Sequence, residues 1–158
     1  MSIRKKIDKV LEITLVVLLL VLVADVLWQV VSRYILPTPS SFTDELAGYL
    51  LIWVGVLGSA YVAGLQEHLA IDLLLQRSSA KVQRRLIIII NVIVLLFAVT
   101  VMIVGGMWLV ITRFKFGVVS AALNLPLGYV YSIVPISGLL ISYYSIEIIR
   151  KTIKAKAE

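Results

Sequence analysis

The stretch Val10–Val31, VLEITLVVLLLVLVADVLWQVV, decides the fold because it is apolar for almost its whole length. Roughly 20 apolar residues are enough for an α-helix to cross the hydrocarbon core of a bilayer. Basic residues precede the run, as in a secretory signal, but the run is far longer than the apolar core of a signal and no small-residue cleavage site follows it. We therefore expect a retained membrane helix, with residues 1–158 as the working protein.

Three further apolar runs of spanning length follow, at about Leu46–Leu65, Leu86–Thr112 and Leu127–Ile149. Of the 158 residues, 61% are hydrophobic and 15% are charged, whereas a soluble domain is nearer half apolar and a quarter charged. Pro135 lies inside the fourth run and is expected to kink it, which frees the carbonyl of Tyr131. The sequence predicts an all-α integral membrane protein with one membrane domain, 1–158, and transmembrane helices at about 10–31, 46–65, 86–112 and 127–149.

The basic residues predict the orientation of these helices. If the N-terminus is cytoplasmic, the outside segments carry only Arg33, Arg113 and Lys115. The inside segments then carry Arg4, Lys5, Lys6, Lys9, Arg77, Lys81, Arg84, Arg85, Arg150, Lys151, Lys154 and Lys156. The positive-inside rule therefore favours both termini in the cytoplasm. Contacts of these clusters with anionic membrane lipids account for the net charge of +6, so we expect lipids and no nucleic acid as partners.

Polar residues inside the first apolar run mark a face that contacts protein. Asp25, Gln29 and Arg33 recur every four residues, which places them on one side of the helix. An ionisable group such as Asp25 is costly inside a membrane and should face protein or water. Asp25 is therefore an ion or proton site, a buried tether to another helix or subunit, or an acid close enough to the membrane surface to be hydrated.

Small residues in the second helix predict a packing face. Gly55, Ser59 and Ala63 recur every four residues, a spacing that lets another membrane helix approach closely. The pattern indicates packing but does not say which helix is packed. We predict that this face contacts a partner subunit, together with the polar face of the first helix.

Charged residues on the predicted outer side suggest a docking surface. Asp44 and Glu45 suit the positive N-terminal end of the second helix, and Ser41 with Asp44 resembles a capping box. Arg113 and Lys115 end the third helix on the same side. We expect these charges to steer a soluble partner toward the membrane surface.

The chain offers little material for catalysis. It has one histidine, His68, and no cysteine, which excludes disulfides, thiolate metal sites and bis-histidine haem ligation. It has no P-loop and no G-x-S-x-G elbow. We expect Glu67, His68 and Asp72 to form a structural corner beside a short segment on the inner membrane surface. The chain is therefore expected to be no enzyme and to hold no cofactor or metal.

The stretch SRYILPTPSSFTDELAGYLLIWVGVLGSAYVAGLQEHLAIDLL, residues 32–74, combines an Arg at the end of one helix, an acidic pair before Leu, a Gly-rich helix and a G-x-x-x-H-x-x-x-D turn. The order of these motifs resembles the small membrane (Q) subunit of tripartite ATP-independent periplasmic (TRAP) transporters. The matching residues are Arg33, Asp44, Glu45, Leu46, Trp53, Gly55, Gly58, Gly64, His68 and Asp72. Asp44 departs from the Glu that is usual there. A second block, residues 120–138, matches at Pro126, Gly128, Tyr131 and Pro135.

This resemblance implies a role in the bacterial inner membrane. In such systems a large polytopic (M) subunit moves the substrate, usually an organic acid, by an elevator-type movement driven by sodium. A soluble periplasmic binding protein (P) delivers the substrate. The Q subunit is expected to enlarge the static scaffold and to help dock the binding protein, while sodium binds to the M subunit. The stretch QEHLAIDLL, residues 66–74, most resembles small subunits of sialic acid systems.

Two alternatives stay open. Asp25, as an intramembrane acid, also suits a self-assembling small transporter or channel. The cluster of Glu67, His68 and Asp72 also suits a membrane-anchor subunit of an enzyme complex, in which these residues would help to hold a metal.

Overall fold

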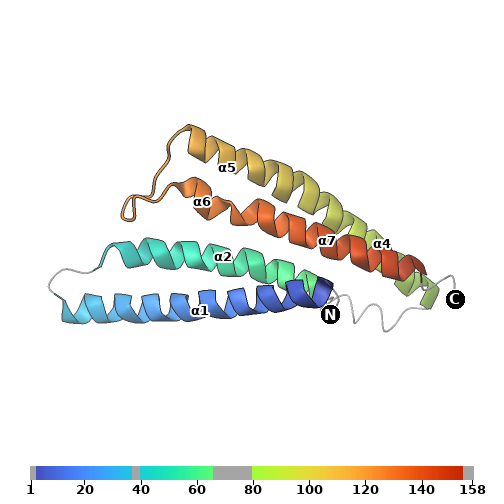
Figure 1. The fold of residues 1–158 in the computed structure, drawn as a ribbon, viewed down its shortest axis with the longest axis horizontal. Helices are drawn as coiled ribbons and strands as arrows, with labels where there is room; N and C mark the ends of the chain where they lie inside the picture. Colours follow the sequence, from blue (N-terminus) through green and yellow to red (C-terminus); the bar gives the residue numbers. More distant parts are fainter. Residues whose placement is uncertain (1–2, 37–39, 66–79, 155–158) are drawn as a thin grey trace. The chain divides into compact units, whose positions relative to one another are not determined.

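The computed structural model describes residues 3–36, 40–65 and 80–154, and these ranges are built of helices (Figure 1). Four helical stretches are long and apolar enough to cross a membrane. They are Arg4–Ile35, Phe42–Leu65, Lys81–Lys115 and Leu127–Lys154. The prediction of an all-α membrane protein with four spanning helices is therefore confirmed.

The helices extend beyond the apolar runs that predicted them. In chain order they are α1 (Ile3–Ile35), α2 (Phe42–Leu65), α4 (Ala80–Phe97), η1 (Ala98–Gly105), α5 (Gly106–Lys115), α6 (Leu127–Tyr131) and α7 (Ile133–Lys154). Charged residues one turn apart can form an ion pair that stabilises a helix beyond its apolar part. In the first turns of α1, Arg4 Nε lies 3.7 Å from Asp8 Oδ2. The surface segment predicted between the second and third spans falls on residues 66–79, outside the described residues.

The third and fourth spans are irregular. The third contains η1, a π-helical stretch between α4 and α5, in which the hydrogen bonds reach one residue further than in an α-helix. The fourth is divided at Ser132 into α6 and α7. This division lies beside the carbonyl of Tyr131, which finds no backbone donor at Pro135 because proline has no N–H group.

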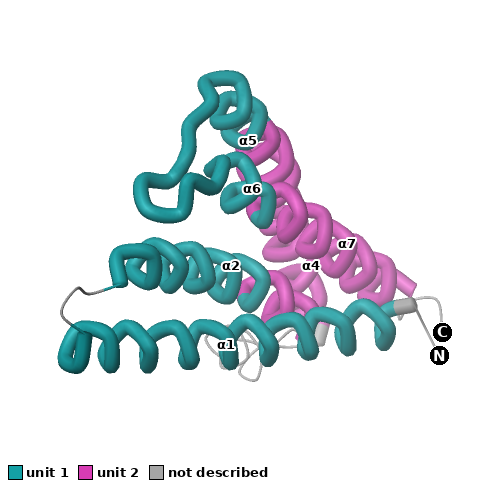
Figure 2. Tube along the Cα trace, turned by 60° about the vertical axis from the view of Figure 1, so that its left-hand side comes forward, with its two compact units in different colours: residues 1–58, 108–133 teal, residues 59–107, 134–158 magenta. Residues whose placement is uncertain are grey.

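The chain divides into two compact units (Figure 2). Unit 1 comprises Met1–Gly58 and Trp108–Ile133, and unit 2 comprises Ser59–Met107 and Val134–Glu158. Each unit is therefore assembled from two separate parts of the sequence, and we describe the contacts of each by itself.

In unit 1, α1 and the first part of α2 lie side by side and antiparallel (Figures 1 and 2). Small hydroxyl side chains fill this contact, because Ser32 and Thr43 are fully buried. The segment 116–126 connects α5 to α6 through a turn at Gly117, whose φ of +58° favours glycine. Val119 and Pro126 face each other across this segment as an isolated β-bridge.

In unit 2, the core is a contact between α2, η1 and α7. Ala60, Ala98 and Ile141 form its buried centre. The residues packed around them are Ala63, Val94, Met102 and Leu140. Gly138 of α7 makes the approach of η1 possible, since a Cβ at this position would lie 2.8 Å from Cβ of Met102 and 3.2 Å from the carbonyl oxygen of Ala98.

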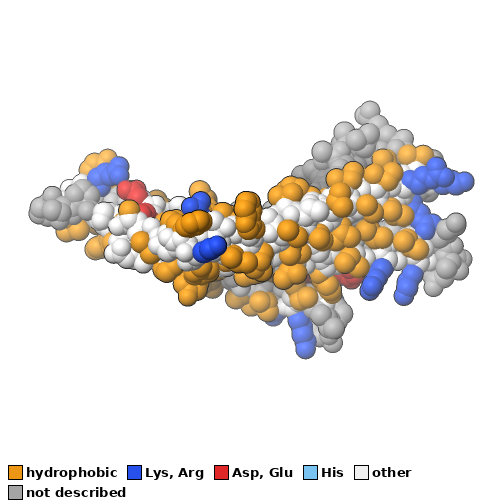
Figure 3. All heavy atoms as spheres, turned by 90° about the horizontal axis from the view of Figure 1, so that it is seen from above, with side chains coloured by type: hydrophobic (Ala, Val, Ile, Leu, Met, Phe, Trp, Pro, Cys, Tyr) orange, Lys and Arg blue, Asp and Glu red, His pale blue; other side chains and the backbone are white. Residues whose placement is uncertain are grey.

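Apolar side chains cover much of the surface of the described residues, as the face in Figure 3 shows. In a soluble protein such exposure would mark an aggregation risk, but here it matches helices that face lipid or other membrane proteins. The spans differ in how much of their own apolar part is buried inside the chain. The apolar part of the fourth span is half buried inside the chain, against 6% for the third, so the fourth span contacts the chain's own residues far more than the third does.

Candidate functional site

The best-connected group of polar side chains lies at the loop end of unit 1, by which we mean the last turns of α1, the first turn of α2, the end of α5 and residues 116–126. Gln29 of α1 donates a hydrogen bond to the carboxylate of Asp44 in the first turn of α2. Ser32 Oγ donates to the carbonyl of Gln29 at 2.9 Å and accepts from the Ser40 N–H at 3.4 Å. Asp44, which the sequence places in a capping box, thus links two helices.

Glu45 holds the segment 116–126 through its backbone. Its two carboxylate oxygens accept hydrogen bonds from the N–H groups of Ala121, Ala122 and Leu123 at 2.9, 3.0 and 3.1 Å. Hydrogen bonds to an ionised acceptor are stronger than those between neutral groups. Glu45 is therefore the residue that positions this segment against the start of α2.

The segment 116–126 also has internal support. The Ser120 N–H donates to the carbonyl of Leu125 at 2.9 Å, and the Leu125 N–H donates to Ser120 Oγ at 3.1 Å. Asn124 takes the left-handed conformation between them, with φ of +51°, which asparagine tolerates better than most residues. The segment is thus a compact turn whose backbone groups are largely paired.

Trp53 of α2 supports the start of the fourth span. Its indole Nε1–H donates to the carbonyl of Val130 at 3.0 Å, next to the division between α6 and α7. A buried indole N–H needs an acceptor, and the carbonyl of Val130 supplies it. This hydrogen bond ties α2 to α6.

An open apolar cavity of about 350 Å³ adjoins these contacts. It is lined by Leu18, Leu46, Tyr49, Leu50, Trp53, Leu123, Leu125, Tyr129 and Val130. Because Leu123 belongs to the segment that Glu45 holds, the polar contacts also set one wall of the cavity.

The three residues of the predicted polar face of α1 have different surroundings in the structure. Asp25 is buried in unit 1, and its Oδ2 has no hydrogen-bond partner among the described residues. Gln29 contacts Asp44, whereas Arg33 is exposed. Asp25 therefore lies toward the chain's own helices, and its role as a tether or an ion site stays a prediction.

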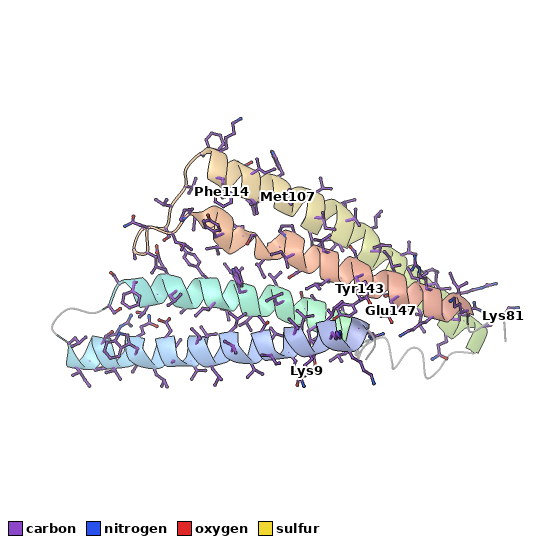
Figure 4. The ribbon with its side chains drawn as sticks, in the orientation of Figure 1. Lys9, Lys81, Met107, Phe114, Tyr143 and Glu147 are labelled. Atoms are coloured by element: carbon purple, nitrogen blue, oxygen red, sulfur yellow. The ribbon has the colours of Figure 1, made fainter. Side chains whose placement is uncertain are left out.

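The predicted docking charges also take different positions. Asp44 and Lys115 are exposed, while Glu45 is engaged with the backbone of 121–123. The guanidinium of Arg113 lies over the ring of Tyr131, 5.7 Å from its centroid. The neighbouring Phe114, at the end of α5 on the side of α6 (Figure 4), meets Tyr129 edge to face at 5.0 Å.

The predicted packing face of α2 separates into two parts. An ideal Cβ at Gly48, Gly55 or Gly58 would meet no described atom within 4 Å, so no described part of the chain packs closely against these glycines. Ser59 is exposed on the same helix. Ala63, by contrast, packs against the core of unit 2.

The corner residues Glu67, His68 and Asp72 lie outside the described residues, so their role stays a prediction. Within the described ranges, the structure contains no cluster of three His, Cys, Asp or Glu side chains that could hold a metal ion.

Sequence reasoning missed the contacts of Glu45 and Trp53. The sequence does carry a partial signal, because Gly117, Ser120 and Asn124 are residues that favour turns. A turn leaves backbone N–H groups that need acceptors. No local pattern, however, indicates that the acceptor comes from a helix that begins far earlier in the chain.

Comparison with known proteins identifies the chain. Residues 22–155 match the family described as tripartite ATP-independent periplasmic transporters, DctQ component. The sialic acid TRAP transporter small permease protein of Vibrio cholerae is 28% identical over 102 residues, which cover 65% of this chain and 59% of that protein. A protein of Haemophilus influenzae, named as a TRAP transporter small permease protein, is 28% identical over 138 residues, or 86% of this chain and 83% of that protein.

The chain belongs to the DctQ component family of TRAP transporters. It is therefore a small permease subunit and not an enzyme, and its four apolar spans make it a multi-pass protein of the bacterial inner membrane. The family implies a tripartite system in which a large membrane subunit and a periplasmic binding protein complete the transporter.

Proposed function

We propose that this DctQ component is the static small subunit of a sodium-driven importer of organic acids. In this proposal it enlarges the scaffold of the large membrane subunit, which binds the sodium, and helps to dock the periplasmic binding protein. The proposal rests on one face of α2, which we call the exposed face. It carries Gly48, Gly55 and Gly58, and no described residue fills the space beside them.

The exposed face of α2 suits a helix of a large membrane partner. Glycine in the middle of a helix weakens it relative to alanine, so a helical glycine that no described neighbour requires needs another reason. A Cβ added at Gly48, Gly55 or Gly58 would meet no described atom within 4 Å. In membranes, small residues at such spacings allow two helices to pack closely, which is the main source of helix association there.

The test is copurification of this chain with its large membrane subunit. Gly55→Leu should reduce the copurified fraction severalfold, because the added side chain holds the partner helix away. Gly55→Ala is the matched control and should reduce it much less. The thermal unfolding midpoint of the chain alone should not fall in either variant. If Gly55→Leu leaves copurification unchanged, this face is not the one that the partner covers.

The loop end of unit 1 is the proposed docking surface for the binding protein. This assumes that both chain termini are cytoplasmic, which places the segment 116–126 in the periplasm. Asp44 and Lys115 are exposed there and offer charges of both signs. Glu45 serves the surface indirectly in this proposal, because its hydrogen bonds fix the shape of the segment.

Charge reversal tests the docking proposal. Lys115→Glu should slow association of the binding protein with the assembled membrane complex, and the slowing should shrink as the salt concentration rises. Lys9→Glu makes the same charge change near the start of α1, far from the loop end. It should leave the association rate unchanged. Equal effects of the two variants would argue against docking at the loop end.

Sialic acid is the proposed substrate, supported by the name of the Vibrio cholerae relative. Uptake of radiolabelled sialic acid into liposomes that contain both membrane subunits, with the binding protein outside, tests this proposal. Uptake should require a sodium gradient. Sodium-driven uptake of a different organic acid would keep the subunit proposal and replace the substrate.

A self-assembling channel is the second candidate. The buried Asp25 favours it, since its Oδ2 has no hydrogen-bond partner in the part of the chain that the structure describes. It predicts ion or proton flux through liposomes that contain this chain alone. It further predicts that Asp25→Asn lowers the flux at least tenfold. Absence of flux, or flux that Asp25→Asn does not change, removes this candidate.

A further inference from the structure

The first turns of α4 and the last turns of α7 meet at one end of unit 2, which we call the basic end. Arg84 Nη2 donates a hydrogen bond to the carbonyl of Ile153 at 3.0 Å, so the two helix ends are in contact. The basic residues there are Lys81, Arg84 and Arg85 from α4, and Arg150, Lys151 and Lys154 from α7. Figure 4 shows Lys81 beside the end of α7.

The acidic residues of α4 and α7 do not balance the charge of these two helix ends. Glu147 is the only acid in α4 and α7, and it is paired with Lys151 at 2.7 Å. The first turn of α4 contains no acid, although a helix N-terminus carries partial positive charge. Basic side chains held together in this way repel one another, so an anion that binds between them lowers the free energy of the folded chain.

Arg84 has donor capacity that the described residues leave unused. Its Nε is hidden from solvent and has no hydrogen-bond partner among them, while Nη2 is occupied by Ile153. A guanidinium presents its donors in a planar fork that matches the oxygens of a phosphate. Because Nε is hidden from solvent, an anion at this end would meet the Nη groups of Arg84, whose planar arrangement suits a phosphate.

The surroundings of the basic end fit a lipid better than a soluble anion. The apolar part of the third span begins at Leu86, directly after the basic residues of α4, which places those residues at the level of the headgroups. Val82 and Ile153 are exposed apolar residues on the two helix ends. A bound phospholipid would thus find charge for its headgroup and apolar surface for its acyl chains.

We propose that the basic end of unit 2 binds the phosphate headgroup of an anionic phospholipid, with Arg84 as the residue held in place to receive it. Lys81, Arg85 and Lys154 are exposed and add attraction for the headgroup. Each Lys or Arg near an anionic lipid surface contributes roughly fivefold in affinity, equivalent to about 1 kcal/mol.

Native mass spectrometry of the full chain tests the proposal, with phosphatidylglycerol and phosphatidylcholine of identical acyl chains as probes. The chain should bind phosphatidylglycerol at least roughly tenfold more tightly, from the contribution of each basic residue. The triple variant Lys81→Gln, Arg85→Gln, Lys154→Gln should lose most of this preference. The matched control Arg33→Gln, Arg113→Gln, Lys115→Gln removes the same charge from the loop end of unit 1, outside the basic clusters, and should keep it.

Three outcomes would overturn the proposal. Equal losses in the two triple variants would mean that net charge alone attracts the lipid. An unchanged preference in the first triple variant would place the lipid elsewhere. Full displacement of phosphatidylglycerol by millimolar inorganic phosphate would identify a site for a soluble anion. Helix content from circular dichroism confirms folding, and Arg85→Gln alone should weaken binding roughly fivefold if the triple variant does not fold.

Discussion

The contact between α7 and η1 in unit 2 and the exposed face of α2 are both rich in small residues, but the space beside those residues differs. At Gly138 an added Cβ would lie within 3.2 Å of both the side chain of Met102 and the backbone of Ala98. At Gly55 it would meet no described atom within 4 Å. The first glycine is thus required by the chain's own packing, while the second leaves room for a partner. The difference shows that the spacing of small residues does not identify their role. The atoms that lie opposite each residue decide whether it packs within the chain or leaves space for a partner.

The largest effect on stability should come from filling the space beside Gly138, where η1 packs against α7. Gly138→Leu should lower the free energy of unfolding of the chain by about 3 kcal/mol, because the backbone of η1 cannot move away from the new side chain. Thermal unfolding of the purified chain in detergent, followed by circular dichroism, measures this. An unchanged midpoint would show that η1 yields easily and that the contact is loose.

Gly128 offers a finer test, because the nearest atoms opposite it belong to the ring of Phe114. A Cβ at this position would lie 2.6 Å from Cδ2 of Phe114, and that side chain can turn aside. Gly128→Ala should therefore cost about 1 kcal/mol, at the low end for an overpacked site. The same unfolding assay should show that Phe114→Leu recovers much of this loss in the double variant. Additive losses in the double variant would mean that the ring is not the obstacle.

The smallest effect should have the opposite sign. Gly58→Ala should stabilise the isolated chain by about 0.5 kcal/mol, because alanine favours the helix and its Cβ meets open space. Unfolding midpoints of the two chains, compared under identical detergent conditions, measure the change. A clear loss of stability would place an unseen contact on the exposed face of α2 and would remove the contrast with α7.

The sequence was sufficient for the spans and for the family resemblance. Apolar runs of spanning length follow directly from the thickness of a bilayer, so the run Val10–Val31 predicted α1 without any tertiary information. The motifs from Arg33 to Asp72 predicted a TRAP small subunit, and the family match confirms it. These features are local in the sequence, which is why the sequence reveals them.

Contacts between distant residues could not be predicted in the same way. Glu45 and Ala121 are paired by the fold, and nothing in the sequence around either residue indicates the other. The face of Gly55, Ser59 and Ala63 had the right spacing, but only the structure separates Ala63, which joins the core of unit 2, from the open Gly55. Helical spacing fixes which side of a helix a residue is on, while the partner of that side depends on the whole fold.

The hydrogen bonds of Glu45 end on the backbone of residues 121–123 and not on their side chains. Every amino acid except proline carries the same N–H group at these positions. The side chains of Ala121 and Ala122 can therefore diverge between species while the turn keeps its shape. If the loop end docks the binding protein as proposed, substitutions at Ala121 and Ala122 could change its contact surface while Glu45 keeps the shape of the turn.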